Sequence, residues 1–564
     1  MPVKQPNEIR FSGALNNLNT AIDLFQRKRG EVPLMVNCDI TLPGKLSPLK
    51  TLLALNAGAG TTIHSLFVGN GVVFIVDGIT LQYLSTSSLV TLLALTASTK
   101  MSWAKAGNWI FCANGADKQA IYINTPVACA WGLAIPTVMP TVADSGTAGN
   151  PNGTYSCYYR YRVTLPDGSI ILTALSPVGS VTLTTKKINW TVPAYPTFTG
   201  ATSVHVDLFR TSTAMAGNYL VTTLTGATTY TDDLTDAALQ LLTVYAETGY
   251  YPPPAGINLA KYCPASDRVF AVVGNVAYWS EPGKYHVFLY KASVAEYESV
   301  NSVFLAGENI TAVKIIDEQM YFGSTGTWRR LRGKTPVDFK WEDTPAIKGP
   351  INDESAVETP WGVLHPSIDG TMWMFTGITS RQIVPEFVFA TRPTAATAHA
   401  TFDGRFYRLF YGDAANPELM IDFLKYPELP PRVVQSTRSA TASFYDKFTG
   451  KFYMVDAQYV RNGVDASSSI AMRFQTPDIP LSGLSELGKA ASLVYKCNTQ
   501  GEDMTVTPYV DDVAGAPITI NTATLKRDYT GVPFGDGYAM SLLFEITSAA
   551  AILIEEPFLL KQDG

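Results

Sequence analysis

Short apolar stretches separated by tight turns recur along this 564-residue chain and predict a protein built of small β-sheets. Between residues 60 and 95 the pattern predicts four strands, at 64–68, 72–76, 80–83 and 90–95. The turn residues Asn70-Gly71 and Asp77-Gly78 separate the first three strands, and such dipeptides between apolar, β-branched runs favour antiparallel hairpins. Four strands in this space match one blade of a β-propeller, for which about 40–45 residues is typical.

The same pattern, a tight turn followed by a strand with aromatic residues, returns at blade-sized steps in the second half of the chain. The turns are Gly274-Asn275, Asp317-Glu318, Asp369-Gly370, Asp403-Gly404 and Thr449-Gly450. The first of them lies in the most regular stretch, residues 268–282. Together with two sets of strands before residue 139, these turns predict an all-β fold with an irregular six- or seven-bladed propeller. Closing sheets into a ring hides most of their edges.

Changes in composition and in the pattern of apolar positions along the chain predict five parts. Residues 1–59 are irregular and predict an extended N-terminal arm, with a short helix at 15–25. Residues 60–139 contain the first propeller blades. Residues 140–255 predict an inserted β-sandwich of the fibronectin or immunoglobulin type, entered through a linker at 145–154, because about seven short strands in roughly 100 residues fit that fold. Residues 256–474 contain the remaining blades, and residues 475–564 predict a C-terminal β-sandwich. Beyond the N-terminal arm, helix is expected at 235–244, as one or two turns.

Charge is scarce in this chain, at 16% of the residues, compared with about 25% in an average soluble domain. Such a surface is typical either of a protein covered by other subunits or of a β-protein rich in Thr and Ser. The net charge is −6, from 42 basic and 48 acidic residues. A protein that binds nucleic acid tightly usually has an excess of basic residues, and the numbers of basic and acidic residues show no such excess. A mildly acidic protein is still compatible with a channel through which DNA slides.

Residue types that carry chemistry are scattered through the sequence. The six cysteines form no C-x-x-C pair and predict buried thiols rather than a disulfide framework or a zinc site. The five histidines have no metal-binding spacing, and the chain contains neither a phosphate-binding loop nor a G-x-S-x-G motif. The segment from Ser367 to Trp373 resembles the Asp box of sialidases but is one residue short, so a β-turn with a buried Trp is favoured. We expect no catalytic, cofactor-binding or metal site.

No apolar run reaches the roughly 20 residues that span a bilayer, and no signal peptide opens the sequence. We therefore expect a soluble protein, or part of a soluble assembly, without a membrane anchor.

Two basic groups are candidate partner contacts. Arg27, Lys28 and Arg29 form a cluster that is either a solvated turn or a contact to an acidic partner. The second group is Arg329, Arg330, Arg332 and Lys334. Alternation along a strand puts several of these charges on one face. This pattern is typical of a solvated edge strand guarded by charge, and a contact to a partner subunit or to phosphate is the functional alternative.

Several stretches resemble the tail nozzle proteins of short-tailed bacteriophages, the group of tail tubular protein B and the DNA-stabilisation proteins. Residues 268–282, Arg-Val-Phe-Ala-Val-Val-Gly-Asn-Val-Ala-Tyr-Trp-Ser-Glu-Pro, are similar to a phrase common in that family. Leu208-Phe-Arg-Thr211 is similar to the family's R-x-Y-R-T strand, with Phe209 in place of the Tyr, and Tyr230-Thr-Asp-Asp233 is similar to the strand that follows. The resemblance covers most of residues 10–480.

The resemblance implies a structural virion protein, not an enzyme. Such a protein forms a ring, expected to be a homohexamer, below the portal and the adaptor or head-completion proteins. The ring surrounds a channel that retains packaged double-stranded DNA and conducts it during ejection, without sequence-specific binding. Tail fibre, spike or needle proteins are the expected outer partners, the location is the phage tail, and assembly takes place in the host cytoplasm. The alternatives are a propeller-type glycan-binding or glycan-degrading tail protein, and a propeller scaffold for protein partners.

Overall fold

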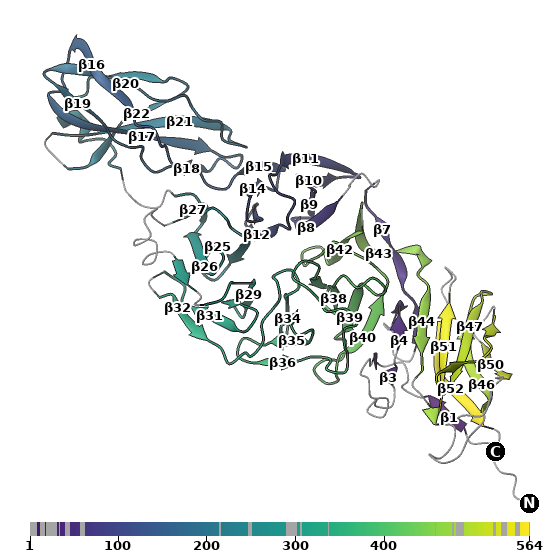
Figure 1. Ribbon diagram of the computed structural model, residues 1–564. Coiled ribbons are helices and arrows are strands. Elements are labelled where there is room, and N and C mark those ends of the chain that lie inside the picture. Colours follow the sequence, from purple (N-terminus) through teal and green to yellow (C-terminus); the bar gives the residue numbers. More distant parts are fainter. Residues whose placement is uncertain are drawn as a thin grey trace, which may run out of the picture.

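The computed structural model shows an almost entirely β protein (Figure 1). It describes residues 8–11, 17–18, 31–32, 34–39, 45–56, 62–213, 216–245, 251–288, 302–304, 307–336, 338–456, 458–476, 479–480, 490–522, 526–531, 539–546 and 553–562. Among these residues the one α-helix is α1 (Asp236–Leu239), which lies inside the stretch expected to contain helix. No helix in the described part is long and apolar enough to cross a membrane.

Seven small antiparallel sheets form the central part of the molecule. The first contains β8 (Ile63–Gly69), β9 (Val72–Asp77), β10 (Thr80–Ser85) and β11 (Ser88–Ala94). The second contains β12 (Ser102–Ala106), β13 (Trp109–Ala113), β14 (Lys118–Tyr122) and β15 (Val127–Ala130). The third contains β24 (Leu259–Cys263), β25 (Arg268–Val273), β26 (Val276–Glu281) and β27 (Lys284–Phe288), with β28 (Ser302–Phe304) also paired to β26.

The remaining four sheets follow in chain order. The fourth contains β29 (Ala312–Ile316), β30 (Gln319–Gly323), β31 (Trp328–Arg332) and β32 (Lys340–Asp343). The fifth contains β33 (Val357–Thr359), β34 (Gly362–Pro366), β35 (Met372–Phe375) and β36 (Ser380–Gln382). The sixth contains β37 (His399–Phe402), β38 (Phe406–Phe410), β39 (Glu418–Asp422) and β40 (Arg432–Ser436). The seventh contains β41 (Ala442–Asp446), β42 (Lys451–Asp456), β43 (Tyr459–Ser469) and β7 (Lys50–Ala54).

Each sheet packs a face on the next sheet, and the seventh packs on the first. Adjacent residues of β26 pack on two different sheets. Trp279 lies in the core shared with the fourth sheet, and Tyr278 lies in the core shared with the second sheet. Val455 of the seventh sheet packs with Ile75 of the first. From the second sheet to the seventh the first strands of consecutive sheets contact each other, and β41 contacts β8. The contacts between the sheets therefore form a closed cycle.

An N-terminal strand completes the last sheet of this cycle. β7 pairs with β43, so that a strand near residue 50 is the fourth strand of a sheet whose others lie beyond residue 440. Leu52 of β7 packs with Phe410 and Phe452 in the core between the sixth and seventh sheets. Asn56, just after β7, accepts a hydrogen bond from Val460 N and donates one to Gln458 O, which fixes the end of the strand.

A second N-terminal strand, β4 (Leu34–Val36), joins the sixth sheet to the C-terminal part. It lies between β40 and β44 (Met472–Gln475) in a continuous 11-stranded sheet. The same sheet continues into β51 (Ala539–Ile546), β47 (Met504–Val510), β48 (Val513–Ala514), β45 (Ile479–Pro480) and β49 (Ile518–Ile520). Asn37 has a left-handed backbone (φ 56°), and its side chain bonds Thr437 and Ala471 O at this junction.

A six-stranded sheet forms the rest of the C-terminal part. Its strands are β5 (Cys38–Asp39), β6 (Lys45–Pro48), β52 (Leu553–Gln562), β46 (Ala490–Asn498), β50 (Lys526–Gly531) and β1 (Glu8–Phe11). The short strands β2 (Asn17–Leu18) and β3 (Glu31–Val32) pair with each other.

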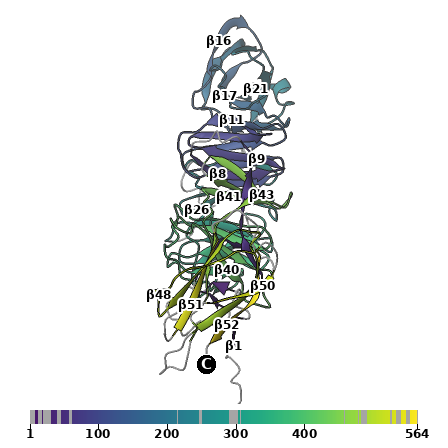
Figure 2. The ribbon, with the colours of Figure 1, turned by 90° about the vertical axis from the view of Figure 1, so that its right-hand side faces the viewer.

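Two sheets lie between β15 and β24 in the chain. One contains β16 (Thr141–Ala148), β20 (Lys186–Thr191) and β23 (Thr229–Asp232). The other contains β17 (Gly153–Thr164), β18 (Ile170–Leu172), β19 (Gly179–Leu183), β21 (Ser203–Thr211) and β22 (Asn218–Leu224). Their facing residues, among them Trp190 and Leu208, share one core. These two sheets and the C-terminal sheets lie at opposite ends of an elongated molecule (Figures 1 and 2).

Several expectations from the sequence are confirmed at the level of single turns, and two are wrong. Gly274 and Asn275 form the turn between β25 and β26, and Asp317 and Glu318 both have positive φ between β29 and β30. Residues 145–148, expected in a linker, belong to β16. Of the helix expected at 15–25, Asn17–Leu18 is a strand, and the other residues lie outside the described ones.

Candidate functional site

A cavity of about 580 Å³ lies at the centre of the seven sheets. Every sheet contributes residues of its first strand to the wall, so that positions from His64 to Tyr445 meet there. A second cavity of about 490 Å³ shares Glu358, Phe402, Tyr445 and Lys447 with the first and is otherwise lined by residues of β29 and of the fifth and sixth sheets, many of them in turns. We call the first of these the central cavity. Residues from the first strands of all seven sheets converge on it.

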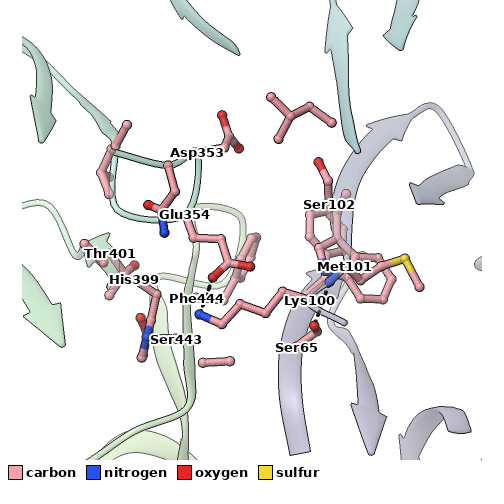
Figure 3. Close-up of a pocket in the computed structure, with 18 of the residues that line it drawn as sticks. Ser65, Lys100, Met101, Ser102, Asp353, Glu354, His399, Thr401, Ser443 and Phe444 are labelled. Carbon is pink, nitrogen blue, oxygen red and sulfur yellow. Dashed lines mark hydrogen bonds and ion pairs between the residues drawn. The ribbon is translucent and has the colours of Figure 1, made fainter. Parts of the chain in front are cut away.

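Three ion pairs line the central cavity. The Lys100 ammonium lies 2.6 Å from a Glu354 carboxylate oxygen, as the dashed line in Figure 3 shows. Lys261 Nζ lies 2.8 Å from Glu358 Oε1. Lys314 Nζ lies 2.9 Å from Asp353 Oδ1. All three carboxylates belong to the fifth sheet and the turn before it, and the lysines come from the second, third and fourth sheets. The ion pairs therefore connect one sheet with three others.

Two of these carboxylates also satisfy backbone groups. Val313 N donates a hydrogen bond to Asp353 Oδ1, and Ile315 N donates one to Glu358 Oε1, each over 2.9 Å. Both donors lie on β29, the first strand of the fourth sheet, which has no ladder partner on that side. Buried backbone N–H groups need an acceptor, and the carboxylates of the fifth sheet supply it. The fifth sheet and the turn before it are therefore joined to β29 by hydrogen bonds from backbone N–H groups to side chains, and not by a β-ladder.

The ion pairs perturb the acidity of their members in different directions. Burial raises the pKa of Glu358, but the Lys261 and Lys314 ammonium groups outweigh it and bring the pKa to about 2. Burial lowers the pKa of Lys261, but the Glu358 and Asp353 carboxylates outweigh it, so the pKa is raised. Glu354 differs, because burial dominates over its contact with Lys100 and raises its pKa. Burial also dominates at Lys314 and lowers its pKa, despite the Asp353 carboxylate beside it.

His399 is a cavity residue whose hydrogen bonding is incomplete. It is 3% exposed and stacks on Phe410 with the ring centroids 5.0 Å apart. Nδ1 lies 3.4 Å from Thr397 O, and Nε2 has no partner. Burial, together with the Lys100 charge, lowers its pKa to about 3. The imidazole is therefore neutral at physiological pH.

Replacing Glu358 tests the contribution of the central ion pairs to stability. Glu358→Gln keeps an acceptor for Ile315 N but leaves Lys261 without its counter-charge, so we expect the free energy of unfolding at pH 7 to fall by about 1–2 kcal/mol. The folded pKa of Glu358 is lowered, so this stabilisation is present above its ordinary pKa of 4.5 and is lost as the pH falls toward 2. Urea unfolding at pH 7 and pH 3 measures both effects.

The matched control for this experiment is Glu545→Gln. Glu545 pairs with Arg473, whose side chain is 52% exposed, and such surface pairs contribute about 0–1 kcal/mol. If Glu358→Gln and Glu545→Gln lowered the free energy of unfolding equally at pH 7, the central ion pairs would contribute no more than a surface pair, which would contradict the prediction.

The predicted basic group at 329–334 lies elsewhere, on β31. Arg329 pairs with Asp343 at 2.7 Å, and Arg330 and Arg332 both pair with Glu342. β31 is hydrogen-bonded to β30 on one side and to β32 on the other, so the prediction of an edge strand is wrong. The strand β32, with the sequence Lys-Trp-Glu-Asp, covers the edge and supplies the counter-charges. Lys334 is exposed, beyond the end of β31.

The other candidate residues take no part in the central cavity. Arg27, Lys28 and Arg29 lie outside the described residues. All six cysteines are buried and none forms a disulfide, as the sequence predicted. No group of three or more His, Cys, Asp or Glu in the described part of the chain could hold a metal ion. Ser367 and Thr371 close a β-turn through Ser367 N, and Trp373, expected to be buried, is half-buried with its Nε1 donating to Thr371.

Residues from the family-like stretches contact one another inside the fold. Arg210, of the stretch 208–211, is fully buried and donates to Asp232, of the stretch 230–233, over 2.6 Å. It also donates to Leu234 O and Asp236. In the stretch 268–282, the buried Arg268 donates to Ser280 O, and Ser280 Oγ accepts from Val269 N. These stretches therefore build sheets, and none of their side chains lines the central cavity.

Comparison with known proteins gives no family. No protein-family model matches the chain, and no curated protein matches its sequence. Among solved structures, the computationally designed Ika8 protein is 11% identical over 73% of this chain and 99% of its own, with a TM-score of 0.34.

Two further solved structures are similar at a comparable level. The extracellular domain of a putative hybrid two-component system from B. thetaiotaomicron is 10% identical over 94% of this chain and 74% of its own, with a TM-score of 0.23. PorZ, a surface component of the type-IX secretion system of Porphyromonas gingivalis, is 9% identical over 88% and 86%, with a TM-score of 0.23. Similarities this low carry no argument about function.

Sequence reasoning did not find the residues of the central cavity. Lys261 and Lys314 are each the third residue of the first strand of a sheet, in β24 and β29, and Lys100 lies two positions before β12. A comparison of β24 with β29 would have shown a lysine recurring at the same position of the first strand. The carboxylates that meet them, Asp353, Glu354 and Glu358, lie close together in the chain, and no sequence motif marks them.

Proposed function

We propose that the seven sheets form a closed seven-bladed β-propeller, with a β-sandwich inserted after the second blade and a second β-sandwich at the C-terminal end. The cycle of contacts supports the closure, since the cores between successive sheets include one between the seventh and the first. The strand β7 closes the ring by completing the last blade from the N-terminal side. Closure in this manner hides sheet edges that a chain with little charge does not otherwise protect.

We further propose that this chain is a structural tail nozzle protein of a short-tailed bacteriophage. The observation that carries the proposal is the Arg210–Asp232 ion pair, because it joins two stretches that were identified separately as family-like. Both partners are fully buried, so their role is to hold the inserted sheets together. This contact supports the proposal because it makes the two stretches parts of one structural unit in this chain.

In the proposed assembly, copies of the chain form a ring whose channel runs between subunits, not through a single propeller. The central cavity of one chain is crossed by three ion pairs and measures about 580 Å³, far too little for a DNA duplex. An elongated subunit, with extra sheets at both ends of the propeller, suits the wall of a tube (Figure 2). Adaptor or head-completion proteins above and fibre, spike or needle proteins outside remain the proposed partners.

Sedimentation equilibrium of the purified protein over a hundredfold concentration range tests this proposal. We expect a discrete oligomer with the mass of six chains, and no turnover of polysaccharide substrates. A monomer at every concentration, including in mixtures with adaptor rings, would count against a nozzle.

A further inference from the structure

The second cavity, of about 490 Å³, opens to solvent between the turns of four successive sheets. Its lining includes one exposed residue from each turn that follows a first strand, namely Asp317 after β29, Pro360 after β33, Gly404 after β37 and Lys447 after β41. The volume lies within the range of about 300–1,000 Å³ found for small-ligand sites. A small molecule can therefore enter the second cavity from this end.

Two side chains of opposite charge line the second cavity without a counter-charge. Exposed aspartate and lysine side chains carry full charges at neutral pH, and the charged residues of the described lining are Asp317, Glu358 and Lys447. Glu358 is already paired with Lys261 and accepts a hydrogen bond from Ile315 N. Within the described part of the chain, the side chains of Asp317 and Lys447 form no ion pair or hydrogen bond, either with each other or with another residue.

The acidic residues next to these two side chains in the sequence do not line the second cavity. Glu318 belongs instead to the lining of a separate small hollow. Asp446 is buried, and it holds the turn after β41 by accepting hydrogen bonds from Phe448 N over 3.1 Å and from Thr449 Oγ1 over 2.7 Å. Neither turn therefore supplies a carboxylate that compensates Lys447.

Aromatic rings line another part of the second cavity. They belong to Trp361, Phe402 and Tyr445. Trp361 is held in place by stacking on Phe423, with the ring centroids 5.2 Å apart, and its ring lies 6.0 Å from that of Phe402. Aromatic rings attract an ammonium group and also cover an apolar body from water. The second cavity thus combines one free cation, one free anion and an aromatic wall.

We propose that the second cavity binds a small zwitterion of the amino-acid type, in which one apolar body carries an ammonium group and a carboxylate. The carboxylate pairs with Lys447, the ammonium pairs with Asp317, and the body lies against the aromatic wall. A molecule with both charges compensates both side chains, whereas a simple anion or cation leaves one of them unpaired. The site lies within one chain, and it does not depend on the tail assembly proposed above.

Saturation-transfer difference NMR titrations with the intact protein test the proposal. Three probes share one apolar body, because phenylalanine carries both charges, 3-phenylpropionate only the carboxylate and phenethylamine only the ammonium. Glycylphenylalanine carries the two charges farther apart. We expect at least one zwitterion to bind about fivefold more tightly than either single-charge probe, the effect of one accessible ion pair. A zwitterion affinity no higher than that of a single-charge probe, or no transfer to either zwitterion, would overturn the proposal.

Two variants that each neutralise one charge assign the two ends of the ligand. Lys447→Gln should weaken binding of the zwitterion about fivefold and remove its advantage over phenethylamine. Asp317→Asn should weaken it by a similar factor and remove its advantage over 3-phenylpropionate. Asp317 has a positive φ of 48°, a conformation that asparagine also adopts, so the turn is retained in this variant. Unchanged affinity in either variant would overturn the assigned pairing.

Each variant has a matched control close to it in the chain. Lys451→Gln removes an exposed lysine of the same β41–β42 hairpin, and Glu318→Gln removes an exposed carboxylate of the same turn as Asp317. Neither residue lines the second cavity, so both controls should bind the zwitterion as the unaltered protein does. Thermal unfolding of all four variants establishes that they fold. Equal weakening in a variant and its control would trace the effect to the overall surface charge and would overturn the site.

Discussion

Acidification from pH 6.5 to pH 5 is expected to destabilise this protein by roughly 5 kcal/mol, because the slope for each of three buried histidines rises toward about 1.4 kcal/mol per pH unit below pH 6.5. Burial lowers the pKa of His286 to about 4, of His365 to about 4 and of His399 to about 3. The unfolded chain takes up a proton at each site below pH 6.5, and the folded chain does not. Stability is therefore full above pH 6.5 and falls until the folded pKa is reached.

The surroundings of each histidine explain why it stays neutral. His286 lies edge-on to Trp109 and Phe111, and both of its ring nitrogens lack partners, with Asp167 as the nearest opposing charge. His365 accepts from Trp328 Nε1 at 3.4 Å. Neither ring has a carboxylate against it that would stabilise an imidazolium.

Urea unfolding between pH 7.5 and pH 5 measures this dependence. His365→Gln is expected to reduce the slope of the free energy against pH by about a third. The control is Phe389→Leu, which removes buried apolar surface and lowers stability by about 1 kcal/mol at every pH. A slope that is unchanged in His365→Gln would contradict the assignment of the acid sensitivity to the buried histidines.

Leu52→Asp is expected to cost about 3–5 kcal/mol, because it places a carboxylate in the core between the sixth and seventh sheets. Leu52 is 7% exposed and packs with Phe410, Phe452 and Met454. Its neighbour Leu53, on the opposite face of the same strand, is 48% exposed. Leu53→Asp is therefore the matched control and should change stability by less than about 0.5 kcal/mol.

This pair of variants examines how β7 closes the cycle of sheets. If β7 is an integral part of the seventh sheet, Leu52→Asp lowers the midpoint of the single unfolding transition measured by circular dichroism. Similar midpoints in Leu52→Asp and Leu53→Asp would show that the strand does not pack as described and would weaken the proposed closure.

The sequence predicted much of the local structure because turns and alternation are local signals. The first sheet was expected at 64–95, and its strands run from Ile63 to Ala94. In the C-terminal part, β47, β49 and β51 likewise coincide with runs of apolar and β-branched residues. These segments carry Gly, Asn or Asp at their turns and β-branched or aromatic residues between them.

Contacts between distant segments were not predictable in the same way. β7 looks like part of an irregular arm, and only its partner some 400 residues later makes it the last strand of a sheet. β32 is too polar to be recognised as a strand, so Arg330 seemed to lie on an open edge. The residues of the central cavity were not predicted for the same reason. Lys100 and Glu354 are separated by 254 positions in the chain, and they meet because the contacts between the sheets form a cycle.

Electron microscopy of the purified protein tests the central proposal most directly. A tail nozzle is expected to appear in class averages as a sixfold ring with an opening wide enough for a DNA duplex, each subunit extending beyond a seven-bladed disc at both ends. Single, separate particles of one propeller with two appended lobes, under conditions that preserve assemblies of other tail proteins, would contradict it.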